Sequence, residues 1–328
     1  MGYKHLTINQ REIIWLMRSV GYSCREIGEQ LHVDKSSVSR ELKRNGGIEN
    51  YLPVKAQIGY CLRRQNCHGK HILDDTELYE YVRAKFFEEQ WSPEQIAGRL
   101  SMENGKNVIS FPTIYREIYS GRFDKDAPVK SKIGAAKLLR RKGKSLRNGR
   151  KGSKRGGIKI SNELCARPDE ANNRKRIGDW EADTVIGKLG KACLVTMNDR
   201  KSLFLLLGKS EAKKSEPVKD VMIKLLEGKP CETITPDRGT EFANHEDVSE
   251  ALGGVQFYFP PPYQPWQRGM NENCNGLLRE YFPKGKDLSG ATEEYIQSVA
   301  DKINKRPRKT LGWKTPFEIF YSKSLHLA

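Results

Sequence analysis

Long hydrophobic runs are scarce in this sequence of 328 residues. The longest, such as 203–207, are far shorter than the roughly 20 apolar residues that a membrane-spanning helix needs. The opening residues Met1–His5 begin no signal-peptide core. We therefore expect a protein without membrane segments that works in the cytoplasm.

Cysteine is also sparse, with seven residues scattered along the chain. An odd number without a regular spacing predicts reduced thiols rather than a disulfide framework. Cys61, Cys67, His68 and His71 could be read as a zinc site, but their spacing fits no usual ligand pattern.

Acidic residues are missing from 130–159, which holds thirteen Lys or Arg, six Gly and almost no aromatics. The whole chain has 58 basic and 41 acidic residues, a net charge of +17. Such a cluster indicates nucleic acid as the partner, although a generically basic protein is the alternative. Within residues 123–170 we predict a flexible linker that tracks DNA phosphates.

The first fifty residues contain three sequence patterns that start helices. Thr7 with Gln10 and Ser23 with Glu26 form capping boxes, and Asp34 caps a third helix at 35–44. Three short helices with a tight turn before the last one are the layout of a helix-turn-helix. We predict such a DNA-binding domain at residues 1–50.

The outer face of this third helix carries hydroxyls and cations. Such side chains suit base edges and phosphates, so we predict that they contact DNA. A small packing module with a solvated polar face is the alternative. The predicted contacts are Ser36, Ser37, Ser39, Arg40 and Lys43.

Residues 51–122 read as mostly helical. Ser92 with Pro93 starts one helix, and Ser110 starts another. The pair resembles a second, weaker helix-turn-helix with Thr113 and Arg116 facing outward, and a helical hairpin packed on something else is the alternative.

The remaining residues, 171–328, alternate strands and helices. Three closely linked strands begin near Trp180 and predict an antiparallel meander, and the full order is β-β-β-α-β-α-β-α. That order predicts an α/β ribonuclease-H-like domain with a mixed five-stranded sheet. The whole chain is thus expected to be multidomain, with all-α modules preceding it.

Three carboxylates in this domain are candidate metal ligands. Asp183 lies in the first strand, Asp237 ends the fourth, and Glu272 begins the last helix. Magnesium binds through a few carboxylates, waters and phosphate. Without a cation, two carboxylates 4 Å apart repel by about 4 kcal/mol at an effective dielectric of 20. Each acid alone could be an ordinary surface charge, but all three together predict a metal site.

Four motifs carry a resemblance to a known family. They are GDWEADTV at 178–185, TPDRGTEF at 235–242, NENCNGLLR at 271–279 and NKRPRKTLGW at 304–313. With these motifs, and with 34 residues between Asp237 and Glu272, the chain resembles bacterial transposases of the insertion sequence 30 family. That family lies within the Asp-Asp-Glu transposase and retroviral integrase superfamily, and the resemblance covers nearly the whole chain.

The resemblance implies a mechanism and partners. Asp183, Asp237 and Glu272 would be the catalytic triad and the ligands of two Mg²⁺ ions, with Mn²⁺ able to substitute. Arg279 would contact DNA near the site. The substrates would be double-stranded DNA carrying the terminal inverted repeats and the target DNA, bound by a homodimer in the bacterial nucleoid. The chemistry would be hydrolysis to free a 3′-hydroxyl, followed by strand transfer.

Two other functions fit parts of the sequence. A transcription regulator would use the C-terminal region for ligand binding or oligomerisation, and the three acids argue against it. A stand-alone nuclease of the same fold would need no module that reads a defined DNA site.

Overall fold

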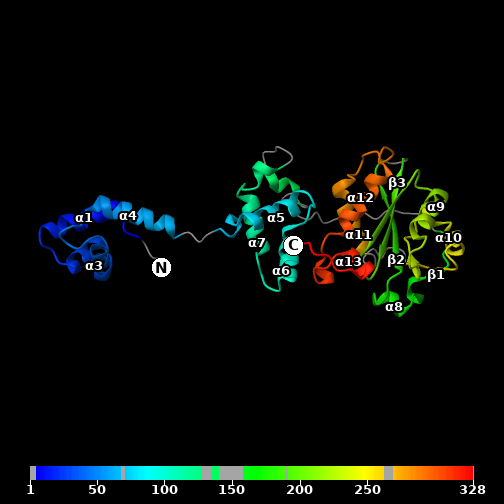
Figure 1. The fold of residues 1–328 in the computed structure, drawn as a ribbon, viewed down its shortest axis with the longest axis horizontal. Coiled ribbons are helices and arrows are strands. Elements are labelled where there is room, and N and C mark those ends of the chain that lie inside the picture. The colour runs from blue at the N-terminus through cyan, green and yellow to red at the C-terminus, as the bar shows by residue number, and fades with distance from the viewer. Residues whose placement is uncertain are drawn as a thin grey trace. The chain divides into compact units, whose positions relative to one another are not determined.

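The computed structural model describes residues 5–67, 71–127, 134–139, 158–188, 191–261 and 269–327. The chain divides into two compact units, Met1–Asp74 and Asp75–Ala328 (Figure 1). Most of the basic stretch 130–159 lies outside the described residues, so its role as a linker stays a prediction, as do the domain boundaries at 50, 122 and 170.

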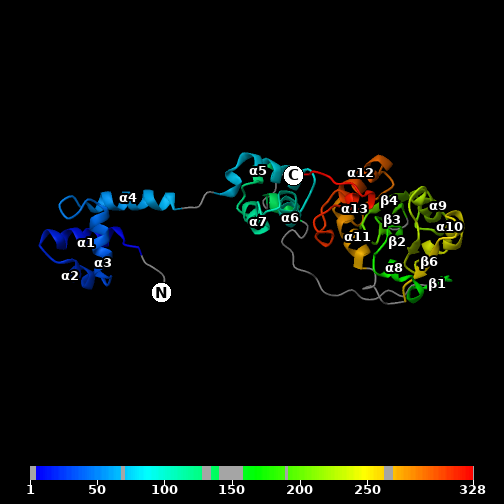
Figure 2. The ribbon, with the colours of Figure 1, turned by 60° about the horizontal axis from the view of Figure 1, so that its bottom comes forward.

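The first unit contains four α-helices among its described residues, α1 (Ile8–Ser19), α2 (Cys24–Leu31), α3 (Lys35–Arg44) and α4 (Pro53–Asn66), and ends with the short 3-10 helix η1 (Ile72–Asp74). The predicted starts of the first three are confirmed, because Thr7 and Ser23 form complete capping boxes and Asp34 accepts from the Ser36 amide. Ile14, Ile27 and Val38 are fully buried between these helices. Helix α4 lies beside α1 (Figure 2).

A buried ion pair joins three helices of this unit. Arg11 of α1 is 2% exposed, and its Nε donates to Glu41 of α3 at 2.7 Å. Its Nη1 also donates to Gln57 of α4 at 2.6 Å. A buried guanidinium needs such partners, so this contact fixes how α3 is presented.

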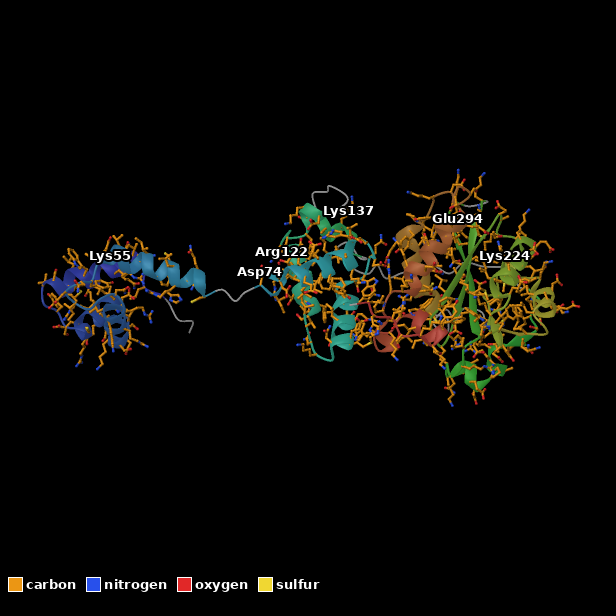
Figure 3. The ribbon with its side chains drawn as sticks, in the orientation of Figure 1. Lys55, Asp74, Arg122, Lys137, Lys224 and Glu294 are labelled. Atoms are coloured by element: carbon orange, nitrogen blue, oxygen red, sulfur yellow. The ribbon has the colours of Figure 1, made fainter. Side chains whose placement is uncertain are left out.

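The second unit begins with a helical module of α5 (Thr76–Phe87), α6 (Pro93–Asn104) and α7 (Phe111–Tyr119). The predicted starts at Ser92 and Ser110 are confirmed by side chains that accept from Gln95 N and Thr113 N. Arg122, which Figure 3 labels in this module, lies over the ring of Tyr79. Its Cζ atom is 5.6 Å from the ring centroid.

The other part of the second unit is built on a mixed sheet. Its strands in space run β1-β6-β5-β2-β3-β4, with β2, β3 and β4 antiparallel and β1, β6, β5 and β2 mutually parallel. The strands are β1 (Asn162–Glu163), β2 (Asp179–Ile186), β3 (Cys193–Asp199), β4 (Leu205–Ser210), β5 (Thr233–Thr235) and β6 (Gln256–Phe259). The predicted meander and mixed sheet are confirmed.

The prediction of five strands is wrong, because the described residues form a six-stranded sheet. Strand β1 lies in the stretch predicted as linker and pairs Asn162 with Tyr258 and Glu163 with Phe259. The Asn162 side chain also donates to the carbonyl of Phe257 at 3.1 Å. Two residues are too few to produce an alternating pattern in sequence, so pattern reasoning could not find this strand.

Helices cover both faces of the sheet (Figures 1 and 2). Ala182 and Val195 pack on one side with Val218 and Val248, from α9 and α10. The other side packs against α11 and α12. The helices are α8 (Asp169–Asn172), α9 (Ser215–Leu226), α10 (His245–Ala251), α11 (Gly269–Tyr281), α12 (Glu293–Asn304) and α13 (Pro316–Tyr321).

An exposed ion pair bridges the two helical layers beyond the edge strand β4. Lys224 of α9 donates to Glu293 of α12 at 3.0 Å, and Figure 3 labels Lys224 together with the adjacent Glu294. Exposed pairs of this kind contribute little stability.

The C-terminal segment, residues 304–327, anchors the α5–α7 module to the rest of the second unit. Arg99 of α6 is fully buried and donates through Nη1 and Nη2 to both carboxylate oxygens of Glu318, at 2.7 Å and 3.0 Å. Gln95 donates to the Pro307 carbonyl at 3.0 Å, and Lys309 pairs with Glu94 at 2.7 Å. On its inner side, α6 thus packs on another element, as the alternative prediction of a packed helical hairpin expects.

All seven cysteines are free thiols. Burial raises the pKa of the Cys193 thiol to about 11 and that of the Cys274 thiol to about 12. Across the described ranges, no helix is long and apolar enough to cross a membrane.

Candidate active site

The first two carboxylates belong to neighbouring strands, Asp183 within β2 and Asp237 two residues after the end of β5. Strands β2 and β5 run parallel, and the pairing of Glu181 with Thr235 is the last in their register. If the chain kept this register for two more residues, Asp183 would face Asp237 across strands about 4.8 Å apart. Pro236 cannot donate to a ladder, which accounts for the end of β5 at Thr235.

Asp183 is held by two donors. Its Oδ1 accepts from the Thr184 amide at 2.9 Å, and its Oδ2 accepts from Nδ2 of Asn275 at 2.8 Å. Asn275 belongs to α11, so this hydrogen bond ties the helix that carries Glu272 to the strand that carries Asp183.

The third carboxylate, Glu272, lies three residues before Asn275 on α11, and residues with that spacing share a helix face. Its neighbour Asn271 is buried and bonds to the side chain of Asn198 at 3.2 Å and to the Ala182 carbonyl at 3.5 Å. Glu272 itself is exposed. On the side of α11 that faces the core lie Cys274, Leu277 and Leu278.

The chemistry of these three side chains fits a hard divalent cation, which prefers carboxylate oxygens. Asp237 uses Oδ1 to accept from the Gly239 amide at 2.8 Å, which orients its carboxylate at the start of the following turn. Among the residues that the structure describes, no group of three or more His, Cys, Asp or Glu is gathered as a metal site. The predicted gathering of Asp183, Asp237 and Glu272 around metal therefore stays a prediction.

A fourth carboxylate, which sequence reasoning missed, lies next to this site. Glu241 in the short helix η5 (Thr240–Phe242) is 3% exposed. It accepts from the Thr184 hydroxyl at 2.9 Å and pairs with Lys213 at 2.8 Å. The only sequence signal was its position four residues after Asp237, which does not reveal a contact with β2.

Arg279, predicted as a DNA contact, is bound to backbone. Its Nη1 donates to the carbonyls of Ile186 at 2.9 Å and Phe282 at 3.2 Å. Burial lowers the pKa of its guanidinium. This residue therefore fastens α11 to the end of β2, and a role on DNA stays a prediction.

Helix α3 presents the predicted DNA-contacting face to solvent. Ser36, Ser39, Arg40 and Lys43 are exposed, while Ser37 is half-buried. Arg40 folds back along the helix, with Nη2 donating to Ser36 Oγ at 2.7 Å. The first helix-turn-helix thus has a continuous polar outer surface.

Helix α7, the outer helix of the predicted second helix-turn-helix, has a mixed exposed face. Arg116 is exposed, whereas Thr113 is half-buried, with its hydroxyl 2.8 Å from that of Ser110. Residues 75–127 contain ten acidic and seven basic residues, the opposite balance to the whole chain. Thr113 and Arg116 stay predicted contacts.

Comparison with known proteins connects this geometry to a family. Residues 2–45 match the model of a helix-turn-helix domain. The transposase for insertion sequence element IS4351 of Bacteroides fragilis is 39% identical over 97% of this chain and 95% of its own length. The transposase InsI for insertion sequence element IS30A of Escherichia coli (strain K12) is 35% identical over 96% and 83%. The chain belongs to the insertion sequence 30 family of transposases.

Membership of this family confirms the resemblance read from the sequence motifs. Among solved structures, the catalytic core domain of BIV integrase is similar with a TM-score of 0.35 and 19% identity, over 44% of this chain and 93% of that one. That likeness is too low to carry an argument.

Proposed function

We propose that this protein is a DNA transposase that cleaves and joins DNA strands with Asp183, Asp237 and Glu272 of a ribonuclease-H-like domain. The observation that supports the proposal is the parallel pairing of β2 with β5, which ends two residues before Asp183 and Asp237, together with the hydrogen bond from Asn275 to Asp183. Paired aspartates at one sheet position, with a glutamate on the adjoining helix, suit metal-dependent chemistry at phosphorus.

The three side chains would have different roles in the site. Asp183 and Asp237 are both fixed by backbone amides, from Thr184 and Gly239, and would form a rigid base for the site. Glu272 is exposed and would close over it when DNA phosphate arrives. Two bound Mg²⁺ ions, or Mn²⁺ in their place, would activate the attacking oxygen and stabilise the leaving oxygen.

The first module supplies recognition in this proposal. The exposed face of α3, with Ser39, Arg40 and Lys43, would enter a groove of the terminal inverted repeat. The basic stretch 130–159 would hold phosphates without reading sequence. Joining two element ends requires two sites, so a homodimer on DNA follows from the reaction.

A strand-transfer assay tests the proposal. Purified full-length protein is incubated with duplexes that carry candidate repeat ends, in Mg²⁺ and in Mn²⁺, and products are resolved on a sequencing gel. We expect cuts at the repeat ends and joined products. Asp183→Asn should abolish both reactions and leave repeat binding intact, whereas the exposed Asp220→Asn on α9 is the matched control and should retain activity.

Other outcomes identify the alternatives. Unspecific degradation without joining would indicate a nuclease. Full strand transfer by Asp183→Asn would show that the carboxylate is not needed and overturn the proposed site. Binding to repeat DNA without any metal-dependent cleavage by wild type would favour a regulator.

A further inference from the structure

The carboxylate of Glu241 lies beside the proposed site, and no metal is needed to explain its burial. It is 3% exposed and accepts from two donors, Oγ1 of Thr184 and Nζ of Lys213. A buried carboxylate without partners would be costly, so the lysine balances its charge and the hydroxyl satisfies a further lone pair.

Thr184 reaches Glu241 from the face of β2 opposite to Asp183. Side chains alternate along a strand, and Val185 packs in the core beside α11 while Ala182 packs in the core beside α9. Asp183 therefore points toward the α11 side and Thr184 toward the α9 side. The hydrogen bond to Glu241 therefore joins β2 to the turn after Asp237 on the face opposite to Asp183, one residue along the strand.

Gly239 shows how closely Glu241 is joined to Asp237. A Cβ built on Gly239 would lie 2.4 Å from Glu241 Oε2 and 2.7 Å from Asp237 Oδ1. Both carboxylates thus border one small space, into which the backbone of residue 239 fits without a side chain. The turn after Asp237 can adopt this shape because residue 239 is glycine.

We propose that Glu241 is a positioning residue that sets the separation of the two aspartates, with Thr184 and Lys213 as its supports. This positioning role rests on the proposed function, because it concerns the same two aspartates. The turn that orients Asp237 is held to β2 through the Thr184–Glu241 hydrogen bond. Lys213 keeps the fourth carboxylate neutralised, so that it neither repels the aspartates nor draws the cation away from them.

The test measures Mn²⁺ binding and strand transfer separately. The dissociation constant is measured on full-length protein by electron paramagnetic resonance of free Mn²⁺, and kcat and KM for repeat-end DNA are measured alongside. Thr184→Val removes the hydroxyl at nearly constant shape and Thr184→Ser restores it. Lys213→Met removes the charge and Lys213→Arg restores it. Lys219→Met on α9, a lysine paired with Glu216 at 2.5 Å, is the matched control.

We expect Thr184→Val and Lys213→Met each to weaken Mn²⁺ binding by about 10- to 100-fold, the usual effect of losing a residue behind a metal ligand. Their kcat should fall while KM for DNA stays unchanged, and Thr184→Ser, Lys213→Arg and Lys219→Met should resemble wild type. A fall in melting temperature with unchanged Mn²⁺ affinity would make the cluster merely structural and overturn the inference.

Two further results have distinct meanings. If Glu241→Gln abolishes Mn²⁺ binding as completely as Asp237→Asn does, Glu241 is itself a ligand and the positioning role is wrong. If the wild-type protein neither binds Mn²⁺ nor transfers strands, the proposed function fails. If the wild-type protein does both and Thr184→Val has the same Mn²⁺ affinity and strand-transfer rate, only the positioning role of Glu241 is rejected.

Discussion

The indole of Trp313 covers Gly98 of α6 so closely that a Cβ on residue 98 would lie 2.3 Å from two of its ring carbons. Trp313 adopts a left-handed backbone conformation, with φ of 68°, and its carbonyl accepts from Arg99 at 3.2 Å. Gly98 therefore allows the C-terminal segment to lie directly on α6, and the ion pair of Arg99 with Glu318 completes the contact.

Gly98→Ala should destabilise the second unit. The added methyl group forces the indole or the helix to shift, and overpacking of this kind costs about 1–3 kcal/mol. Urea unfolding followed by tryptophan fluorescence measures the change. Gly290→Ala is the matched control, because a Cβ there would meet nothing within 4 Å. Equal midpoints for the two variants would show that the contact is absent in solution.

Glu318 should make stability depend on acid pH. Burial alone would raise the pKa of its carboxyl, but hydrogen bonds from Arg99, the Leu325 amide and Thr315 lower it from 4.5 to about 2. A folded-state pKa below the unfolded one stabilises the fold above about pH 4.5, and this contribution is lost as the pH falls toward 2. Glu318→Gln should lower the free energy of unfolding at pH 7. The variant should also lose less of that free energy than wild type between about pH 4.5 and 2.

Urea midpoints at a series of pH values check this. Glu227→Gln, an exposed residue at the end of α9, is the control for a generic loss of charge. If the difference between wild type and Glu318→Gln is the same at pH 7 and pH 2.5, the carboxylate is not the source of the dependence.

Arg40→Ala should weaken binding to the terminal repeat by about 1–3 kcal/mol if the guanidinium reads a base. Fluorescence anisotropy with repeat and random duplexes measures the two affinities. Arg25→Ala, which removes an exposed cation paired with Glu29 on α2, is the control and should change affinity little. An equal loss on both duplexes would show that Arg40 contacts phosphate.

Replacing six of the cations in 130–159 by glutamine should weaken binding to every DNA sequence. Each phosphate contact that is lost reduces the slope of log affinity against log salt by about 0.9. Titrations between 50 and 300 mM salt, as experimental conditions, measure that slope. An unchanged slope would mean that this stretch does not contact DNA.

Local chemistry made much of the fold predictable. The caps at Thr7, Ser23, Asp34 and Ser92 depend on residues within one turn, and the structure contains all four. Each of these features is decided by neighbours in sequence, which is the range over which pattern reasoning works.

The features that sequence reasoning missed are decided by distant residues. Strand β1 exists because Asn162 meets Tyr258, and Glu241 matters because Thr184 and Lys213 reach it. Arg279 was predicted as a DNA contact, and its hydrogen bond to the carbonyl of Ile186 was not predicted. The predicted meeting of Asp183, Asp237 and Glu272 depends on such distant contacts as well and stays a prediction.

Arg99 and Glu318 are 219 residues apart, so they are made at very different moments of translation. When helix α6 leaves the ribosome, Arg99 can pair with Glu103 of the same helix, whereas Glu318 has not yet been made. A chain that stops before Glu318 would keep Asp183, Asp237 and Glu272 but would lack the carboxylate that both Nη atoms of Arg99 bind.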